Sequence, residues 1–156
     1  MIRPAATADI EFISALQNRP DYLSMIAADH PDQLRSYRTD PSKHLLIFQI
    51  DDTPAGFLLL SIGGSQGVVE LRRCALVKPG HGLGTLMLSE LKHHVFRTLE
   101  AHRLWFDVAA DNTRARRAYE KAGFVCEGAL RHHWKRRSGD YADLALYGML
   151  RDEYDA

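Results

Sequence analysis

Cysteine is scarce in this sequence, and neither sign of charge is in excess. Its 156 residues include two cysteines, Cys74 and Cys126, too few for a disulfide framework, so a reducing cytoplasm is expected. Lysine and arginine number 20, as do aspartate and glutamate, whereas a dedicated nucleic-acid binder usually shows a basic excess. No apolar run approaches the roughly 20 residues of a membrane span, and residues 1–4 do not open a signal peptide. We therefore expect a cytoplasmic protein with no membrane segment and no nucleic-acid partner.

Hydrophobic residues make up 46% of the chain and charged residues 26%, which is typical of a soluble globular protein. The length predicts one domain over residues 1–156, and neither a repeat nor a linker interrupts it. The neutral total hides a division, because residues 1–70 carry nine acids and five bases, and residues 71–156 carry eleven acids and fifteen bases. This division either arises by chance or reflects ligands of opposite charge.

The hydrophobic pattern predicts an α+β fold of mixed α/β type. Three consecutive strands separated by short turns should form an antiparallel meander. Apolar residues recur every four positions from Leu83 to Leu99, which places them on one face of a long helix. Residues 18–30 follow neither period. We expect a central mixed sheet of about seven strands flanked by helices, with strands at residues 2–4, 44–50, 55–62, 68–77, 104–109, 124–131 and 141–150, and helices at 7–16 (capped by Thr7), from Pro31 onward, at 83–99 and at 112–122.

Three glycines, Gly80, Gly82 and Gly84, stand between a predicted strand and the long helix. A glycine-rich turn before a helix presents free backbone N–H groups and the positive end of the helix dipole, and both favour a bound phosphate. The spacing excludes a dinucleotide fingerprint, which would need glycine at Thr85, and a P-loop, which would need Lys-Ser/Thr after its second glycine. Two interpretations remain: a phosphate site, or a tight turn that only begins the helix.

A second segment, residues 112–124, contains a helix with a defined start and end. Asn112 suits an N-cap and Gly123 suits a left-handed C-terminal turn, while Tyr119 lies two turns into the helix. All of this is compatible with plain architecture, in which Tyr119 packs as an aromatic core residue.

In this order, the two segments resemble those of the GNAT N-acetyltransferases. Residues 77–84 (Val-Lys-Pro-Gly-His-Gly-Leu-Gly) resemble the acetyl-CoA-binding loop of that superfamily, and residues 112–124 resemble the segment that follows it. The C-terminal pattern over residues 127–154 is similar to the RimJ/RimL-like branch, which acetylates protein N-termini and assorted small amines. One departure is Pro79, where the superfamily usually has Gln or Arg, so that backbone N–H groups would do more of the pyrophosphate binding.

The resemblance implies a GNAT-type domain that uses acetyl-CoA as co-substrate, without a metal. It would transfer acetyl directly to a primary amine, either a protein N-terminal α-amine or a small amine. Two alternatives stay open: a polyamine or antibiotic acetyltransferase on the same fold, and an acetyl-CoA-binding sensor without catalysis. Dimers are common in this branch, so a homodimer is a further expectation. The charge division would then match a polyanionic cofactor on residues 71–156 and a cationic amine near residues 1–70.

The resemblance also assigns roles to individual residues. Glu70 would take the proton of the amine through water, although a solvated strand glutamate fits the same position, and Tyr119 would protonate the departing thiolate. Cys74 is able in principle to carry an acetyl group, but a buried structural thiol is the favoured interpretation. The backbone of Leu76, Val77 and Lys78 would bind the pantetheine arm, and Asn112 would contact the cofactor arm. The residues expected to bind the pyrophosphate are Gly80, His81, Gly82, Leu83, Gly84 and Thr85. The nucleotide phosphate would be bound by Arg114, Arg116 or Arg117, for which a solvated helix face is the alternative.

Overall fold

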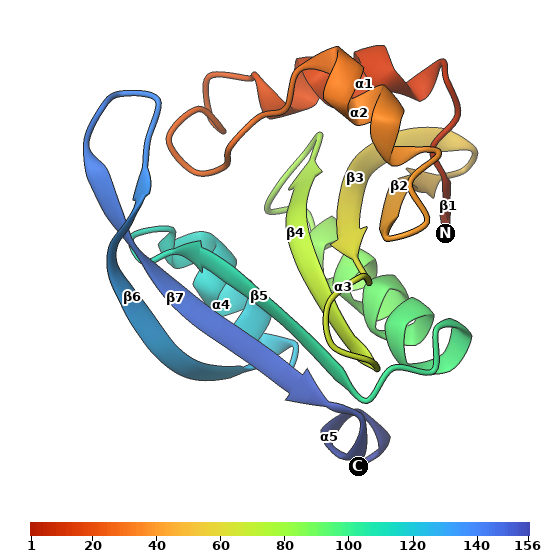
Figure 1. Cartoon of the computed structure of the whole chain (residues 1–156), viewed down its shortest axis with the longest axis vertical. Helices are drawn as coiled ribbons and strands as arrows, with labels where there is room; N and C mark the ends of the chain where they lie inside the picture. Colours follow the sequence, from red (N-terminus) through yellow and green to blue (C-terminus); the bar gives the residue numbers. More distant parts are fainter.

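One mixed sheet of seven strands organises the chain, and the computed structural model describes all of its residues, 1–156. The strands lie in the order β1-β2-β3-β4-β5-β7-β6 (Figure 1). Neighbouring strands are antiparallel except β4 and β5, which are parallel. The strands are β1 Ile2–Pro4, β2 Lys43–Ile50, β3 Thr53–Ser61, β4 Val68–Leu76, β5 Arg103–Ala109, β6 Val125–Lys135 and β7 Tyr141–Leu150.

Helices cover both faces of this sheet. Helices α1 and α2 pack on one face and helices α3 and α4 on the other, so that two apolar cores lie on opposite sides of the strands. Figure 1 shows α3 and α4 behind the strands, and α1 and α2 crossing the top of the view. No helix is long and apolar enough to cross a membrane. The helices are α1 Asp9–Gln17, α2 Pro31–Tyr37, α3 Leu83–His93, α4 Thr113–Lys121 and α5 Arg151–Asp155, with a π-helical turn at His94–Thr98 after α3.

The central strands are buried on both faces, which explains their uninterrupted apolar sequence. In β3, Phe57 and Leu59 belong to the core under α1 and α2, whereas Leu58 and Leu60 belong to the core under α3. Successive side chains of a strand alternate between the two faces of a sheet, so four apolar residues in a row fill both cores. All four side chains are fully buried.

Strands β4 and β5 pair over a short stretch and then separate. Residues Val68–Glu70 pair with Arg103–Trp105, and beyond them Figure 1 shows the strands diverging toward the α1–α2 end. A β-bulge lies at Arg72, because the register of β4 with β3 skips this residue. A bulge bends its strand and redirects the side chains that follow it. The two halves of the sheet are therefore joined only at one end of the β4–β5 pair.

The predicted fold is confirmed in its element order, its antiparallel meander β2–β3–β4 and its seven-stranded mixed sheet. The predicted cap of the first helix is wrong: α1 has Ala8 as its N-cap, and Thr7 accepts a hydrogen bond from Arg38 instead. No side chain caps α1, and the Asp9 carboxylate instead accepts the N–H of Ala6, before the helix, at 2.7 Å.

Two other boundaries differ from those predicted. The regular α-helix that begins at Leu83 ends at His93, and the chain continues as the π-helical turn instead of running as one α-helix to Leu99. Strand β6 extends to Lys135, beyond the predicted end at residue 131, because its hairpin partner β7 pairs with it through Tyr141. The short helix α5 is not predicted from the sequence.

Candidate active site

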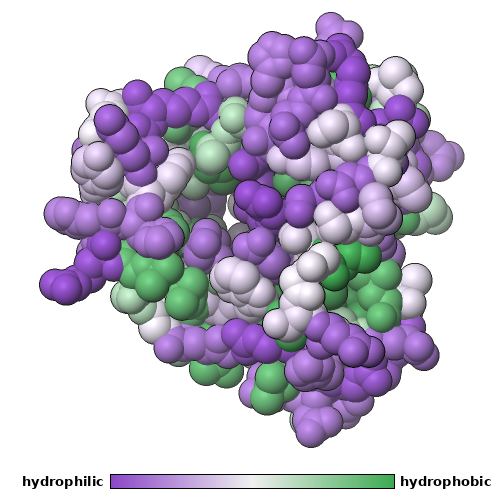
Figure 2. Space-filling view, in the orientation of Figure 1, coloured by the Kyte–Doolittle hydropathy of each residue, from purple (hydrophilic) through white to green (hydrophobic).

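A cavity of about 350 Å³ lies between the diverging strands β4 and β5. Its walls come from these strands, from α3 and α4, and from the segment between α1 and α2, with His133 and Trp134 of β6 also in the lining. Most lining residues are apolar, as is usual for small-molecule sites. Figure 2 shows the surface hollowed near the centre of this view, with hydrophilic residues around the hollow.

The loop that leads into α3 forms one end of the cavity, with Gly80 and Gly84 in the lining. Gly80 and Gly82 have φ angles of 85° and 79°, and a side chain added at either position would meet no atom within 4 Å. The first backbone hydrogen bond of α3 runs from the Leu86 N–H to the Gly82 carbonyl, so the N–H groups of residues 83–85 have no acceptor within the helix. An open loop with free donors at a helix N-terminus fits a phosphate group.

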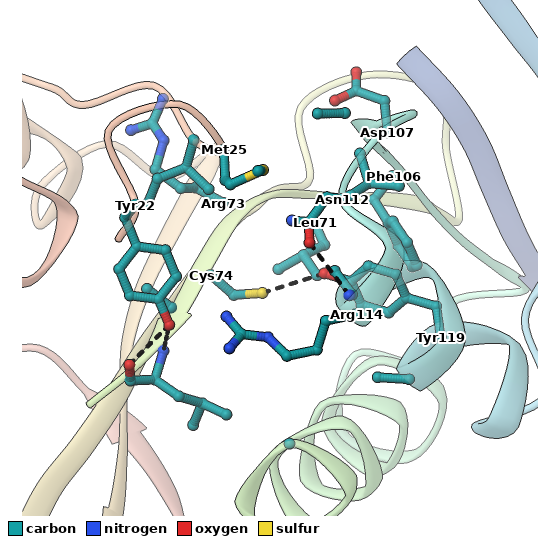
Figure 3. Close-up of a pocket in the computed structure, with 18 of the residues that line it drawn as sticks. Tyr22, Met25, Leu71, Arg73, Cys74, Phe106, Asp107, Asn112, Arg114 and Tyr119 are labelled. Carbon is teal, nitrogen blue, oxygen red and sulfur yellow. Dashed lines mark hydrogen bonds between the residues drawn. The ribbon is translucent and has the colours of Figure 1, made fainter. Parts of the chain in front are cut away.

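Tyr119 projects from α4 across the cavity toward β4. Its helix is capped by Asn112, whose Oδ1 accepts a hydrogen bond from the Ala115 N–H at 3.3 Å. The Tyr119 ring packs against Phe106 of β5 with ring centroids 4.3 Å apart, and its hydroxyl lies 3.6 Å from Cys74 Sγ (Figure 3). Burial raises the pKa of Tyr119 well above its ordinary value, so the hydroxyl stays protonated at neutral pH. It is therefore a proton or hydrogen-bond donor inside the cavity.

The Cys74 thiol contacts Tyr119 and is not an activated nucleophile. Burial raises the pKa of the Cys74 thiol, and the Tyr119 hydroxyl opposes this only in part. A thiol in apolar surroundings stays protonated and inert. This environment agrees with the interpretation of Cys74 as a structural residue.

Charged side chains occupy another part of the cavity. Asp107 follows Phe106 on β5 and therefore points to the opposite face of the sheet. Figure 3 shows its carboxylate directed away from Tyr119. Burial raises the pKa of the Asp107 carboxyl, while the charges of His133 and Arg72, which also line the cavity, act in the opposite direction. We call this part, defined by Arg72, Asp107 and His133, the charged end of the cavity.

Glu70, the predicted base, lies next to the charged end. It pairs with Trp105 at the last position where β4 and β5 are joined, and it does not line the cavity. Burial raises the pKa of Glu70, and the Arg72 guanidinium at 4.0 Å lowers it in part. The charge of Asp107 raises the pKa of Glu70 further. The protonation of Glu70 therefore depends on the charge of Asp107.

Two of the predicted cofactor residues, Leu76 at the free edge of β4 and the following Val77, already have hydrogen-bonded backbone groups. The Tyr22 hydroxyl donates to the Leu76 carbonyl at 2.8 Å and accepts the Leu76 N–H at 2.9 Å (Figure 3). The Val77 N–H donates to the Ala55 carbonyl at 2.8 Å, and the Val77 carbonyl accepts from Arg19 at 2.6 Å. The backbone groups predicted to bind a pantetheine arm are thus paired within the chain.

Residues 18–30, the α1–α2 segment, are tied both to β4 and to the β6–β7 hairpin. The Asp29 carboxylate accepts hydrogen bonds from Arg73 of β4 at 2.6 Å and from the Tyr37 hydroxyl at 2.9 Å. Arg136 of the hairpin donates to the Ser24 carbonyl at 2.6 Å. Figure 1 shows the hairpin tip beside this segment. Elements far apart in the sequence therefore enclose the cavity.

The cavity brings together part of the predicted site. Tyr119 and five of the predicted cofactor residues line it, and Glu70 does not. The five are Leu76, Gly80, Gly84, Asn112 and Arg114. The others are outside the lining: Val77, Lys78, His81, Gly82, Leu83 and Thr85 in the adjoining loop and first turn of α3, and Arg116 and Arg117 on α4.

Five lining residues with charged, imidazole or hydroxyl side chains are not predicted from the sequence: Tyr22, Arg72, Arg73, Asp107 and His133. Alternation along the predicted strand 104–109 separates Asp107 from Phe106, but it does not indicate which of the two lines a cavity, and both do. No sequence pattern marks Tyr22 or Arg72, because Tyr22 lies in a segment without periodicity and Arg72 lies at a β-bulge.

Comparison with known proteins identifies the family. Residues 11–124 match the acetyltransferase (GNAT) family. The chain belongs to this family. It is 36% identical over 95 residues to uncharacterized N-acetyltransferases of Mycobacterium bovis and Mycobacterium tuberculosis. These alignments span 59% of this chain and 59% of each relative.

Solved structures share the GNAT fold over nearly the whole chain. The spermidine N-acetyltransferase of Vibrio cholerae, in complex with CoA and spermine, has a TM-score of 0.87 at 22% identity and covers 100% of this chain and 98% of its own. A dodecameric structure of spermidine N-acetyltransferase from the same organism has a TM-score of 0.81 at 22% identity, covering 99% and 95%. The predicted superfamily is thereby confirmed, whereas these relatives do not place the chain in the RimJ/RimL-like branch.

Proposed function

We propose that the chain is an N-acetyltransferase that moves the acetyl group of acetyl-CoA directly to a primary amine. One observation carries this proposal: a single cavity connects a glycine loop with free N–H donors to a charged end, and the Tyr119 hydroxyl projects into it. Direct transfer requires both substrates in one site, and the two ends suit a polyanionic cofactor and an amine. Membership of the acetyltransferase family and relatives named N-acetyltransferases support the proposal.

The glycine loop would hold the pyrophosphate of acetyl-CoA, the substrate that supplies the activated acetyl group. The N–H groups of residues 83–85 and the positive end of α3 favour phosphate oxygens. Arg114 lines the cavity and reaches from α4 toward β4 (Figure 3), which adds positive charge. Asn112 has its Nδ2 free for a carbonyl of the cofactor arm, because only its Oδ1 caps α4. Pro79 offers no side-chain donor, so the N–H groups of the loop, Arg114 and Asn112 would supply the polar contacts to the cofactor.

The backbone of β4 would polarise the thioester carbonyl. The Val77 N–H points toward β3, because it donates to the Ala55 carbonyl. The N–H of the preceding residue, Leu76, therefore points away from β3. Alternation along the antiparallel ladder gives the Cys74 N–H the same direction, toward the space between β4 and β5. A backbone donor in such a water-poor position stabilises a developing oxyanion.

Tyr119 would give its proton to the departing thiolate. Burial keeps the pKa of Tyr119 high, so the proton is present at neutral pH. Its hydroxyl already lies 3.6 Å from a sulfur atom, that of Cys74, across the space where a thioester would enter. A well-placed general acid contributes roughly 10²- to 10⁴-fold to a rate.

Glu70 would accept the proton of the amine through water. The amine attacks only when neutral, and burial raises the pKa of Glu70 toward the range in which a carboxylate is an effective base. Asp107 lines the cavity and Glu70 does not, so Asp107 would contact the amine and Glu70 would receive the proton one step away.

Two alternatives differ in the acceptor or in the presence of catalysis. The solved relatives are named for spermidine, which favours a small amine over a protein N-terminus as the acceptor. A sensor that binds acetyl-CoA without transferring the acetyl group would use the glycine loop in the same way.

Two measurements test the proposed function. Thermal unfolding with saturating acetyl-CoA should show a higher Tm, because a ligand that binds only the folded state stabilises it. Release of free CoA thiol on addition of a panel of primary amines should then show transfer. Stabilisation without thiol release for any amine would favour the sensor, and the absence of stabilisation would reject both.

A further inference from the structure

We propose that the acceptor is an amino acid, a small primary amine that carries a carboxylate. This inference rests on the proposed acetyltransferase function and narrows its acceptor. The juxtaposition that carries it is a carboxylate without an ion-pair partner, Asp107, and an exposed guanidinium, Arg72, whose one ionic contact is Glu70 at 4.0 Å, at the charged end of the cavity.

The charges of the lining oppose a polycation. Asp107 is the one acidic residue in the lining, which also holds Arg72, Arg73 and Arg114. A polyamine carries several ammonium groups and needs several anionic partners, whereas the guanidinium groups of Arg72 and Arg114 would repel it. The spermidine of the solved relatives therefore does not suit this cavity.

Of the three arginines, Arg73 is paired with an acidic residue and Arg114 lies in another part of the cavity. The Arg73 side chain is 10% exposed and donates to the Asp29 carboxylate at 2.6 Å. Arg114 comes from α4 and reaches toward β4 on the side of the cavity that holds Tyr119 (Figure 3). Arg72 remains able to bind a substrate carboxylate. Its side chain is 43% exposed, and the Glu70 carboxylate lies 4.0 Å away, beyond hydrogen-bonding distance.

Arg72 and Asp107 both line the charged end of the cavity, and the positive charge of Arg72 lowers the pKa of Asp107. A carboxylate attracts the amine of a substrate, and a planar guanidinium binds a carboxylate through two parallel hydrogen bonds. An amino acid presents both groups within a few ångströms and would satisfy both side chains at once. Met25, Ile26 and Trp134 add apolar lining, which favours an apolar amino-acid side chain.

Matched pairs of amines test this inference in the CoA-release assay. L-phenylalanine is compared with 2-phenylethylamine, and L-leucine with 3-methylbutylamine. Each kcat/KM is divided by the fraction of the amine that is neutral at the assay pH. Spermidine is included as the polycation. Members of a pair share the side chain and the primary amine and differ in the carboxylate. We expect kcat/KM to be higher for the amino acid by about tenfold or more, the effect of one hydrogen bond between charged groups.

Variants of Arg72 assign the preference to this residue. Arg72→Gln should raise KM for the amino acid by about tenfold more than it changes KM for the matched amine without a carboxylate. Arg72→Lys should keep part of the preference, because the charge remains but the planar fork is lost. Arg131→Gln, an exposed arginine of β6 outside the cavity lining, is the matched control.

The possible outcomes distinguish failure of this inference, failure of the role of Arg72 and failure of the proposed function. Equal or faster turnover of the amine without a carboxylate, or of spermidine, would overturn this inference and leave acetyl transfer established. A preference for amino acids that persists in Arg72→Gln would overturn the role of Arg72. Absence of turnover with every amine would reject the proposed function and this inference with it.

Discussion

The Tyr22 hydroxyl bonds to both backbone groups of Leu76, donating to the carbonyl at 2.8 Å and accepting the N–H at 2.9 Å. Tyr22 is 8% exposed and belongs to the α1–α2 segment, so one side chain takes the place of a neighbouring strand on the edge of β4. If a pantetheine arm pairs with Leu76, Tyr22 must first leave this position. Binding of acetyl-CoA would then be coupled to the segment that helps to enclose the cavity.

Replacement of Tyr22 by phenylalanine should therefore strengthen acetyl-CoA binding. Loss of the competing hydrogen bonds, worth about 1 kcal/mol, should lower the Kd by about fivefold. The free energy of unfolding should fall by about 1 kcal/mol, because the Leu76 groups lose their partner. Calorimetric titration and urea unfolding measure the two effects. Tyr141→Phe, at a tyrosine that is 55% exposed, is the control, and unchanged or weaker binding in Tyr22→Phe would show that Tyr22 does not compete with the cofactor.

Tyr119→Phe should separate catalysis from binding. The change removes the hydroxyl and keeps the ring that packs on Phe106 at a centroid distance of 4.3 Å. We expect kcat to fall by roughly 10²-fold or more, because the thiolate then leaves without a proton donor. The Kd for acetyl-CoA should change little. Steady-state rates and calorimetry with Tyr119→Phe and Tyr141→Phe test this, and a wild-type kcat in Tyr119→Phe would reject the role of Tyr119 as the acid.

Glu70→Gln should move the pH profile of kcat/KM toward higher pH. A carboxylate accepts a proton only when ionised, so the wild-type rate should fall as the pH drops through the pKa of Glu70, which burial raises. The amide accepts no proton, and the rate of the variant should then follow the fraction of neutral amine alone.

Asp107→Asn is the matched comparison for this profile. It should raise KM for the amine, because Asp107 lines the cavity, and should keep the acidic limb of the profile but move it toward lower pH, because the charge of Asp107 raises the pKa of Glu70. Rates measured across the pH range distinguish the two carboxyl groups. An unchanged profile in Glu70→Gln together with loss of the acidic limb in Asp107→Asn would assign the base to Asp107.

The glycine loop and the start of α4 were predictable because local chemistry determines them. Gly82 adopts a φ of 79°, which favours glycine, and Asn112 caps its helix through its own side chain. Once α4 begins at Asn112, helical spacing alone carries Tyr119 to its position over the cavity.

The charged end was not predictable, because tertiary geometry creates it. Arg72 occupies a bulge that shifts the alternation of β4, and no sequence pattern marks a bulge. The charge division of the sequence does not indicate this acid either, since the one acid in the cavity lining, Asp107, belongs to the basic half of the chain. Asp29 of the acidic half is instead engaged by Arg73.

His94 should make stability depend on pH in the mildly acidic range. Its Nε2 is buried without a hydrogen-bond partner, and the His44 ring lies 6.1 Å away. Burial, together with the charges of His44 and His93, lowers the pKa of His94 below its ordinary value. The unfolded chain therefore binds this proton at a higher pH than the folded chain does, so the stabilisation is complete above about pH 6.5 and is lost as the pH falls below it. His94→Phe should have a weaker pH dependence in urea unfolding, whereas His81→Gln, at an exposed histidine, should behave as the wild type. An equal dependence in His94→Phe and the wild type would show that other groups take up the proton.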